Sequence, residues 1–449
     1  MRSLARLAQS RTAAALAAAA LGIVLAMGAL GAFPRNPGID FYQFWGVPLA
    51  REAAALSATP YADAAAYASV LNAMADASPS QKLKSANRER RSLEPMGTPF
   101  LYATFSVFPA DYEGAQAVYT ALQYAAAGFG IFLLVRLLGL GAWPAACAAL
   151  FVLLAFNPFA QDVRVGNLNS IQLAVLAALI GVSSTKRFTG RPWIDGLFLG
   201  CLALLVALKP NTPWIAAALA LHFAAVRGAR AFLVGAFEAM LLAAAAFAIG
   251  AWKLGGAHAW TEWIALARGL DGSGLALPLE RGNLSLAMLL GQATPGFGSF
   301  AWGIALAAAV ILAFAVALCD AGRSPAPFTA MRGAFSDPWF AASVGILLTF
   351  ASSPLVWPHY HVLLLVPIAW LVLGERRPLG FWGAVLCFAV LSRPVIDTLL
   401  HFEMYRALQW LSLLSWLALL PGVLAYAREA RYARTASRST LSSTNSGRP

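Results

Sequence analysis

Charged residues are scarce in this sequence of 449 residues: Asp, Glu, Lys and Arg together make up 12%, against about a quarter in a soluble domain. Hydrophobic residues make up 60% of the chain, and the mean hydropathy is +0.67. This composition excludes an ordinary soluble domain. Because apolar runs recur along almost the whole chain, it indicates an all-α polytopic integral membrane protein.

The sequence also lacks the short motifs of several enzyme classes. It contains no G-x-x-x-x-G-K-[ST], no G-x-G-x-x-G that opens a helix after a strand, no H-E-x-x-H and no G-x-S-x-G. Its four cysteines lie in or beside apolar runs, which is typical of small buried side chains rather than of disulfides or metal ligands. We therefore expect no metal and no cofactor. An enzyme built on this chain would need a substrate that arrives through the membrane already activated.

The net charge of +12 does not indicate nucleic acid, because no RNA- or DNA-binding motif accompanies it. An excess of Lys and Arg in cytoplasmic loops, with attraction to anionic lipid, is the simpler explanation. When the N-terminus is placed in the cytoplasm, nearly every short basic loop falls on the cytoplasmic face, as the positive-inside rule requires. We therefore predict a multi-pass protein of the inner (plasma) membrane with both termini in the cytoplasm.

Apolar runs predict about 12 transmembrane helices in one domain that covers residues 1–427. Residues 33–114 and 253–297 are predicted to be long outer loops, and residues 428–449 a basic, disordered cytoplasmic tail. The predicted spans are residues 12–32, 115–139, 143–160, 168–184, 193–208, 211–226, 230–252, 298–319, 338–352, 359–374, 378–395 and 405–427.

The first outer loop contains an amphipathic segment and a basic run. The segment "YADAAAYASVLNAMADA" is a candidate for a helix that lies on the bilayer surface. The basic run "KLKSANRERR" carries Arg88, Arg90 and Arg91. As exposed charges, these three arginines are expected to have only a small, salt-dependent effect on activity.

Four polar clusters stand out from the apolar background, and the topology puts all of them on the outer face at helix ends. This arrangement predicts one shared site between the helices and the outer loops. The clusters are "GIDFYQFW" (38–45), "QDVRVGNLNSIQ" (161–172), "LKPNTPW" (208–214) and "SSPLVWPHYH" (352–361).

Asp40 in the first cluster allows two interpretations. It is either a solvated acid where the chain leaves the membrane or a general base, because a carboxylate within hydrogen-bond reach can take a proton from an attacking hydroxyl. Tyr42 and Trp45 would then give it an amphipathic rim, suited to the bilayer interface and to stacking on a sugar ring.

The other clusters supply candidate cations for a phosphate group. Lys209 either extends its ammonium to the interface or binds phosphate, and Arg164 offers the same chemistry through a bidentate fork unless it pairs with Asp162. His359 and His361 form an H-x-H pair, which can bind a metal. Because no carboxylate or cysteine lies close to them in sequence, hydrogen bonding to a phosphate or a sugar hydroxyl is favoured.

At these clusters the sequence resembles glycosyltransferase family 87, of the glycosyltransferase C superfamily. The resemblance runs from about residue 38 to about residue 370, and Asn167 stands where glutamine is the more usual residue. It rests on five segments in order: "IDFYQFW", "TPFLYATFSVFP", "RVGNLNSIQLAVLAALI", "LVALKPNTPWI" and "SSPLVWPHYHVLLLVP".

The resemblance implies a glycosyltransferase C-type fold with an active site on the outer (periplasmic or extracellular) side. Such enzymes transfer a sugar from a polyprenyl-phosphate donor, here most simply mannose, to a lipid-linked or envelope glycan acceptor. Asp40 would be the catalytic base of an inverting displacement, and Lys209, Arg164 or the two histidines would stabilise the leaving phosphate. The same motifs make Asn167, Asn169 and Trp357 candidate substrate-binding residues.

Alternatives remain open at the level of the sequence. A polytopic transporter or lipid flippase would explain the helices and a cationic outer cavity without chemistry, and a non-catalytic partner in envelope assembly is a third reading. The donor sugar could also be arabinose or another pentose. A transporter would show no sugar transfer even in the wild-type protein, which separates the first two hypotheses.

Overall fold

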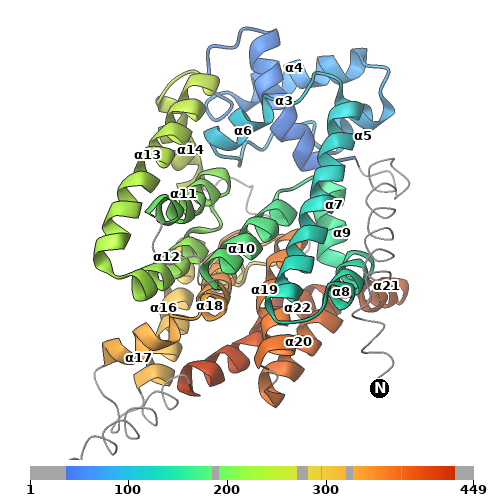
Figure 1. Cartoon of the computed structure of the whole chain (residues 1–449). Helices are drawn as coiled ribbons and strands as arrows, with labels where there is room; N and C mark the ends of the chain where they lie inside the picture. Colours follow the sequence, from blue (N-terminus) through green and yellow to red (C-terminus); the bar gives the residue numbers. More distant parts are fainter. Residues whose placement is uncertain are drawn as a thin grey trace, which may run out of the picture.

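The chain folds almost entirely into helices, as its composition predicts (Figure 1). The computed structural model describes residues 37–184, 192–269, 282–294, 296–319, 327–375 and 377–429. Within these ranges there is no β-sheet, and the strand-like pairing consists of one isolated bridge between Phe156 and Ser392. The predicted span 12–32, residues 270–281 of the second predicted outer loop and the tail beyond residue 429 lie outside the described residues.

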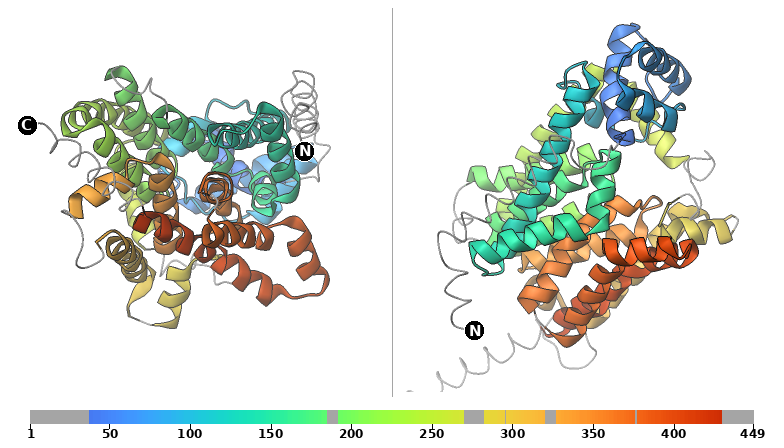
Figure 2. Two further views of the ribbon diagram at one scale, coloured as in Figure 1. Left: turned by 60° about the horizontal axis from the view of Figure 1, so that its bottom comes forward. Right: turned by 90° about the vertical axis from the view of Figure 1, so that its right-hand side faces the viewer.

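Four helices near the start of the chain stand together above the rest of the molecule (Figures 1 and 2). They are α3 (Ile39–Ala53), α4 (Ala64–Ala77), α5 (Gln81–Glu89) and α6 (Pro99–Phe105). We call residues 37–111, which contain them, the outer cap, after the predicted outer loop that they form. The segment predicted as the first long outer loop is therefore largely helical, and most of its basic run lies in α5.

The amphipathic segment of the cap forms helix α4, but its apolar face is already covered. Tyr67, Leu71 and Ala75 on this face are at most 2% exposed. Leu71 packs onto Gly46 of α3 so closely that a Cβ on that glycine would lie 2.7 Å from the Leu71 side chain. The expectation that this face lies on the bilayer is wrong, because α3 buries it first.

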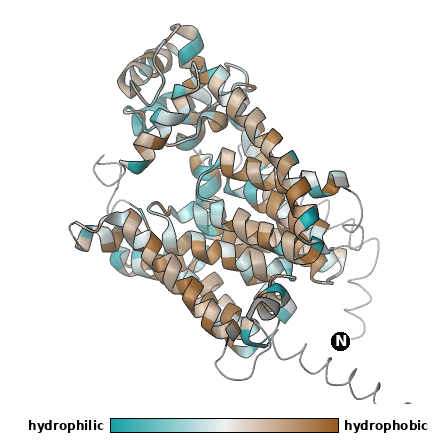
Figure 3. Cartoon of the chain, turned by 90° about the vertical axis from the view of Figure 1, so that its left-hand side faces the viewer, coloured by the Kyte–Doolittle hydropathy of each residue, from teal (hydrophilic) through white to brown (hydrophobic). Residues whose placement is uncertain are grey.

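The remaining described residues form the helix bundle that lies below the cap. Hydrophobic residues dominate its long helices, and hydrophilic residues gather where the cap meets it (Figure 3). The helices are α7 (Tyr112–Leu137), α8 (Ala142–Ala155), α9 (Asn157–Val165), α10 (Asn169–Ser184), α11 (Pro192–Leu208), α12 (Pro213–Arg227), α13 (Ala229–Leu254), α14 (His258–Arg268), α15 (Leu286–Ala293), α16 (Gly298–Cys319), α17 (Pro327–Ala334), α18 (Pro338–Ser352), η4 (Pro358–Leu364), α19 (Leu365–Ala369), η5 (Trp370–Glu375), α20 (Pro378–Val390), α21 (Arg393–His401), α22 (Tyr405–Leu414) and η6 (Ser415–Leu419).

Five of the helical stretches in the described residues are long and apolar enough to cross a membrane. Shorter apolar helices supply six more candidates, so each predicted span from residue 115 onward contains one such helix. The full count of about 12 spans remains a prediction. The five long stretches are Tyr112–Leu137, Ala229–Leu254, Gly298–Leu318, Pro358–Glu375 and Tyr405–Glu429.

Two predicted spans end earlier than hydropathy suggests. Helix α8 ends at Ala155 rather than at residue 160, and α20 ends at Val390 rather than at residue 395. In each case the next helix has proline in its first turn, at Pro158 and Pro394. Proline has no N–H to continue the preceding helix but fits the first turn of a new one. The break after α8 creates the short helix α9, which carries part of the site described next.

Candidate active site

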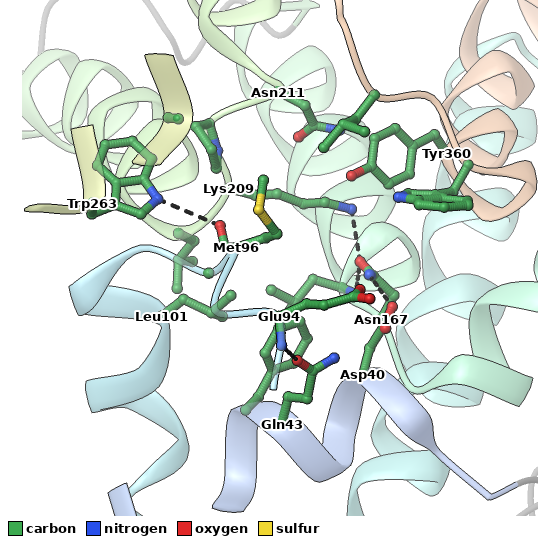
Figure 4. A pocket seen from close by; sticks show the side chains of 18 of the residues that line it. Asp40, Gln43, Glu94, Met96, Leu101, Asn167, Lys209, Asn211, Trp263 and Tyr360 are labelled. Atoms are coloured by element: carbon green, nitrogen blue, oxygen red, sulfur yellow. Dashed lines mark hydrogen bonds between the residues drawn. The ribbon is translucent and has the colours of Figure 1, made fainter. Parts of the chain in front are cut away.

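A cavity of about 270 Å³ lies between the outer cap and the helix bundle (Figure 4). Its walls come from α3, the segment after α5, the turn between α9 and α10, the end of α11, α14 and the segment before η4. Hydrogen bonds join the cap to the bundle beside this cavity. Thr98 Oγ1 donates to the Ala207 carbonyl (2.5 Å), and Trp263 Nε1 donates to the Met96 carbonyl (3.4 Å).

Asp40 is in the first turn of α3, where a helix N-terminus favours a carboxylate. The entry into this helix is fixed by Gly38, whose N–H donates to the Arg164 carbonyl of α9 (3.2 Å). The Asp40 side chain is 14% exposed and lines the cavity. Its Oδ2 accepts a hydrogen bond from Asn167 Nδ2 at 2.7 Å. Asp40 is therefore a fixed acid of the cavity wall rather than a freely solvated loop acid.

Gly166 explains how Asn167 comes within reach of Asp40. It ends α9 with a φ of 73°, a left-handed conformation that favours glycine. A Cβ at this position would lie 2.6 Å from the Cβ of Phe41 in α3. Only glycine therefore satisfies both the turn and the close approach of α9 to α3.

Asp162 organises the start of α10. Its carboxylate is fully buried and accepts hydrogen bonds from Asn169 Nδ2 (2.7 Å), the Ser170 N–H (2.9 Å) and Ser170 Oγ (2.6 Å). Burial raises the pKa of Asp162, while the bonds from Ser170, the charge of Lys209 and the bond from Asn169 oppose that shift. Asp162 is thus a positioning residue, where the sequence suggested only a partner for Arg164.

Lys209 lies at the other end of the same network. Its Nζ donates to Asn167 Oδ1 (2.7 Å) and to Asn169 Oδ1 (2.6 Å), and it lies 4.0 Å from the centroid of the Tyr360 ring. Burial lowers the pKa of Lys209 to about 7, and the charges of Asp162 and Asp40 oppose this. Because the residue is only 7% exposed, its ammonium does not extend to the interface.

These contacts form one continuous chain of hydrogen bonds. It runs from Asp40 through Asn167 to Lys209, and from there through Asn169 to Asp162. This series of hydrogen bonds joins the cap to two separate segments of the bundle. It places a carboxylate and an ammonium group on the two sides of one amide, at the wall of the cavity.

Comparison with known proteins identifies the family. The sequence profile of glycosyltransferase family 87 matches residues 94–343, more than half of the chain. The chain belongs to glycosyltransferase family 87. The resemblance noted in the sequence is thereby confirmed, and the family indicates a membrane protein with glycosyltransferase activity. No curated protein and no solved structure matches the chain.

The family 87 match covers Asn167, Asn169 and Lys209 but ends before His359 and begins after Asp40. His359 nevertheless lies beside Asp40, with its Nε2 4.0 Å from Asp40 Oδ2. That nitrogen is buried and has no hydrogen-bond partner among the described residues. Within the described ranges, no group of three His, Cys, Asp or Glu side chains is close enough to share a metal ion.

Two of the expected phosphate ligands of this family 87 chain point elsewhere. His361 places its ring nitrogens 3.2 Å from the Pro358 carbonyl oxygen and 3.1 Å from that of Ser412, inside the bundle. Arg164 has an exposed side chain whose Nε donates to Gln161 Oε1 (2.9 Å). Neither residue lines the cavity, and His359 does not line it either, whereas Lys209 and Trp357 do.

The expected aromatic rim is also placed differently. Tyr42 and Trp45 are 1% exposed in the core of the cap, where Tyr42 Oη donates to Asn87 Oδ1 (2.8 Å) and Trp45 Nε1 donates to the Pro109 carbonyl (2.8 Å). The residues of α3 that share the cavity with Asp40 are Gln43 and Phe44. The helical period of α3 predicts this arrangement, because Gln43 (i+3) and Phe44 (i+4) lie on the same face of the helix as Asp40 (i).

Three further residues of the cavity wall were missed from the sequence. Tyr360 lies under Lys209, Arg90 faces Asp40, and Asn211 follows Pro210 at the end of α11. Both polar atoms of the Asn211 amide are buried and have no hydrogen-bond partner among the described residues. The neighbouring histidines could have pointed to Tyr360, but Arg90 carries no local signal that separates it from Arg88 and Arg91.

Proposed function

We propose that this family 87 enzyme transfers mannose from a polyprenyl-phosphate donor to a lipid-linked or envelope glycan acceptor, with inversion, on the outer face of the inner membrane. One observation carries the proposal: Asp40 and Lys209 are bridged by the single side chain of Asn167 at the wall of one cavity. Asp40 can then accept the proton of the substrate hydroxyl, and Lys209 places a positive charge near the donor phosphate, in the same cavity.

In the proposed reaction Asp40 takes the proton of the acceptor hydroxyl. The freed oxygen attacks the anomeric carbon on the side opposite the phosphate, and a new glycosidic C–O bond forms. The bond between that carbon and the phosphate oxygen breaks, and polyprenyl phosphate leaves with the electron pair. Lys209 stabilises the developing negative charge through its field. His359 lies beside Asp40 (Nε2 is 4.0 Å from Oδ2) but does not line the cavity, so its contact is with the base rather than with the substrate.

Asn211 supports a sugar in this cavity. A primary amide offers donors and an acceptor side by side, which matches two neighbouring hydroxyl groups of a pyranose ring. Burying both ends of an amide without partners is costly, so a ligand that supplies them is favoured. Trp357 and Phe44 add apolar surface to the same cavity, and a sugar ring can pack on such surfaces.

The direct test incubates membranes that contain the protein with a panel of labelled polyprenyl-phosphate sugars, including mannose and arabinose. We expect transfer from the mannose donor into an extractable glycolipid or envelope glycan, with the opposite anomeric configuration in the product. Transfer from the pentose donor alone would correct the sugar and keep the mechanism. An absence of transfer from every donor, with the protein present and folded, would contradict the proposed function.

The proposed location of the site can be checked by reporter fusions. Fusions after Gly190 and Arg377 should report the cytoplasm, because the short basic loops there obey the positive-inside rule. A fusion after Pro95, which lies in the outer cap, should report the external side. A cytoplasmic signal at Pro95 would place the cap, and with it Asp40, on the wrong face for the proposed acceptor.

A further inference from the structure

The structure separates one arginine of the cap from its neighbours in sequence. Arg88 and Arg91 are exposed, whereas Arg90 is partly buried, with its side chain 20% exposed, and lines the cavity. Arg90 is the residue directly after α5, and its non-helical φ of −133° turns the chain away from the helix axis. The expectation that all three arginines are equivalent surface charges is therefore wrong for Arg90.

The guanidinium of Arg90 faces two carboxylates. Its Nη1 donates to Glu94 Oε2 at 2.8 Å, and its Nη2 lies 3.5 Å from Asp40 Oδ1. Its Nε is buried and has no hydrogen-bond partner among the described residues. A guanidinium carries five donors in a flat fork, so Arg90 retains donor capacity beyond the contact with Glu94. Because Arg90 lines the cavity that contains Asp40, a ligand in that cavity meets its guanidinium.

Lys209 has much less capacity for a direct contact with phosphate. An ammonium group carries three donors. Two of them are used by Asn167 and Asn169, and the face of Tyr360 lies 4.0 Å from the nitrogen. A phosphate that takes either of these two donors breaks a buried contact of the network that also holds Asn167 against Asp40. Lys209 is therefore better suited to shape the site than to grip the donor.

We propose that Arg90, rather than Lys209, makes the direct contact with the donor phosphate. This inference rests on the proposed function and names the residue that binds its leaving group. The fork of Arg90 matches two oxygens of a phosphate, a geometry that a lysine cannot supply. When the phosphate binds the Arg90 guanidinium, the contact between Arg90 Nη2 and Asp40 Oδ1 is lost. Asp40 Oδ1 can then accept the proton of the acceptor hydroxyl. Donor binding thus prepares the base.

The experiment measures how strongly polyprenyl phosphate without a sugar inhibits transfer, together with donor saturation kinetics. The variants are Arg90→Gln and Arg90→Lys, with Arg88→Gln and Arg91→Gln as matched controls from the same basic run. Arg90→Gln should raise both the inhibition constant of polyprenyl phosphate and the donor KM by about tenfold to a hundredfold. Arg90→Lys should fall between it and the wild type, and the two controls should stay within about twofold of the wild type.

Equal inhibition of Arg90→Gln and the two controls by polyprenyl phosphate would overturn the inference. If Arg90→Gln does not accumulate as folded protein, Arg90→Lys decides, because a donor KM equal to that of the wild type would show that the fork is not used. Binding of labelled polyprenyl phosphate to wild type and Arg90→Gln in nanodiscs needs no turnover. An absence of transfer in the wild type would therefore refute the proposed function, whereas equal binding by the two proteins would refute only the role of Arg90.

Discussion

The outer cap and the helix bundle are stabilised by different kinds of side chain. The cap has an aromatic core in which Phe105 contacts Phe41 edge-on (5.8 Å between ring centroids) and Phe44 (5.2 Å). This core continues into the bundle, where Phe41 stacks on Tyr119 of α7 (5.0 Å). Large rings of this kind bury much area in few residues and prefer such offset geometries. The bundle instead contains mostly Leu, Val, Ile, Ala and Phe in its core.

Close helix approaches in the bundle depend on small residues. A Cβ on Gly345 of α18 would lie 2.6 Å from the Ile215 Cα of α12, and one on Gly130 of α7 would lie 3.2 Å from the Ala174 Cα of α10. Small residues allow helix backbones to pack closely inside a membrane, where apolar side chains gain little by leaving lipid. The residues of the candidate site come from both regions, so their alignment depends on how the aromatic cap packs on the close-packed bundle.

The largest effect is expected for the acid that the cap contributes. Asp40→Asn keeps the shape of the side chain and removes the proton acceptor, so transfer should fall by about 10²–10⁴-fold. Transfer kinetics in membranes measure the loss, and retained donor binding shows that the site still forms. Activity within a few-fold of the wild type would show that Asp40 has only a structural role and that the cap does not supply the general base.

The next effect is expected for the ammonium that the bundle contributes. Lys209→Met removes the charge and leaves the amide oxygens of Asn167 and Asn169 without their donor, each at a cost of about 1–3 kcal/mol. Transfer should fall by roughly tenfold to a hundredfold, mainly in kcat, because Asn167 also positions Asp40. Lys253→Met is the matched control, since Lys253 also lies by an aromatic ring (4.9 Å from that of Trp252) but not at this cavity.

Lys209→Arg sharpens the same comparison. If only charge mattered, this variant would keep much of the activity. Because the ammonium is enclosed by two asparagine side chains and the Tyr360 ring, a larger fork should fit poorly and rescue little. A kcat of Lys209→Arg near that of the wild type would show that this enclosure accommodates a guanidinium and that a positive charge alone is sufficient for activity.

A smaller effect is expected where cap and bundle meet at Gly166. Gly166→Ala forces an alanine into a left-handed conformation, at about 1–2 kcal/mol, and against Phe41, at a further ~1–3 kcal/mol. Gly139→Ala is a matched control, because Gly139 has a φ of 88° but a Cβ there would have nothing within 4 Å. Thermal unfolding in detergent should therefore show a clearly lower Tm for Gly166→Ala, and equal Tm values would mean that the two regions can separate slightly at little cost.

The smallest effect is expected inside the cap. Tyr42→Phe removes only the hydrogen bond to Asn87, so the free energy of unfolding should fall by about 1 kcal/mol while transfer stays within about twofold. Transfer assays and thermal unfolding of the same preparation measure both quantities. A large rise in acceptor or donor KM would show that the ring reaches a substrate and that the cap opens during the reaction.

Much of the bundle follows from the sequence alone. Runs of apolar residues are local, and a helix that must satisfy its own backbone in lipid is specified by the run itself. Helices therefore occur at all eleven predicted spans between residues 115 and 427. Asp40, Asn167 and Lys209 were also recognisable as candidates, because polar residues at the ends of apolar helices are conspicuous and the order of their motifs resembles that of family 87.

The tertiary structure alone decided which polar residues share the cavity. Arg88, Arg90 and Arg91 are nearly identical in local sequence, yet only the turn at the end of α5 carries Arg90 to Asp40, fifty residues away in the chain. Tyr42 and Trp45 flank Gln43 and Phe44 in sequence but face the opposite side of α3, toward the core of the cap. Hydropathy and motifs describe neighbours along the chain, whereas a site is made by contacts across it, and those depend on how α3, α5, α9 and α11 pack.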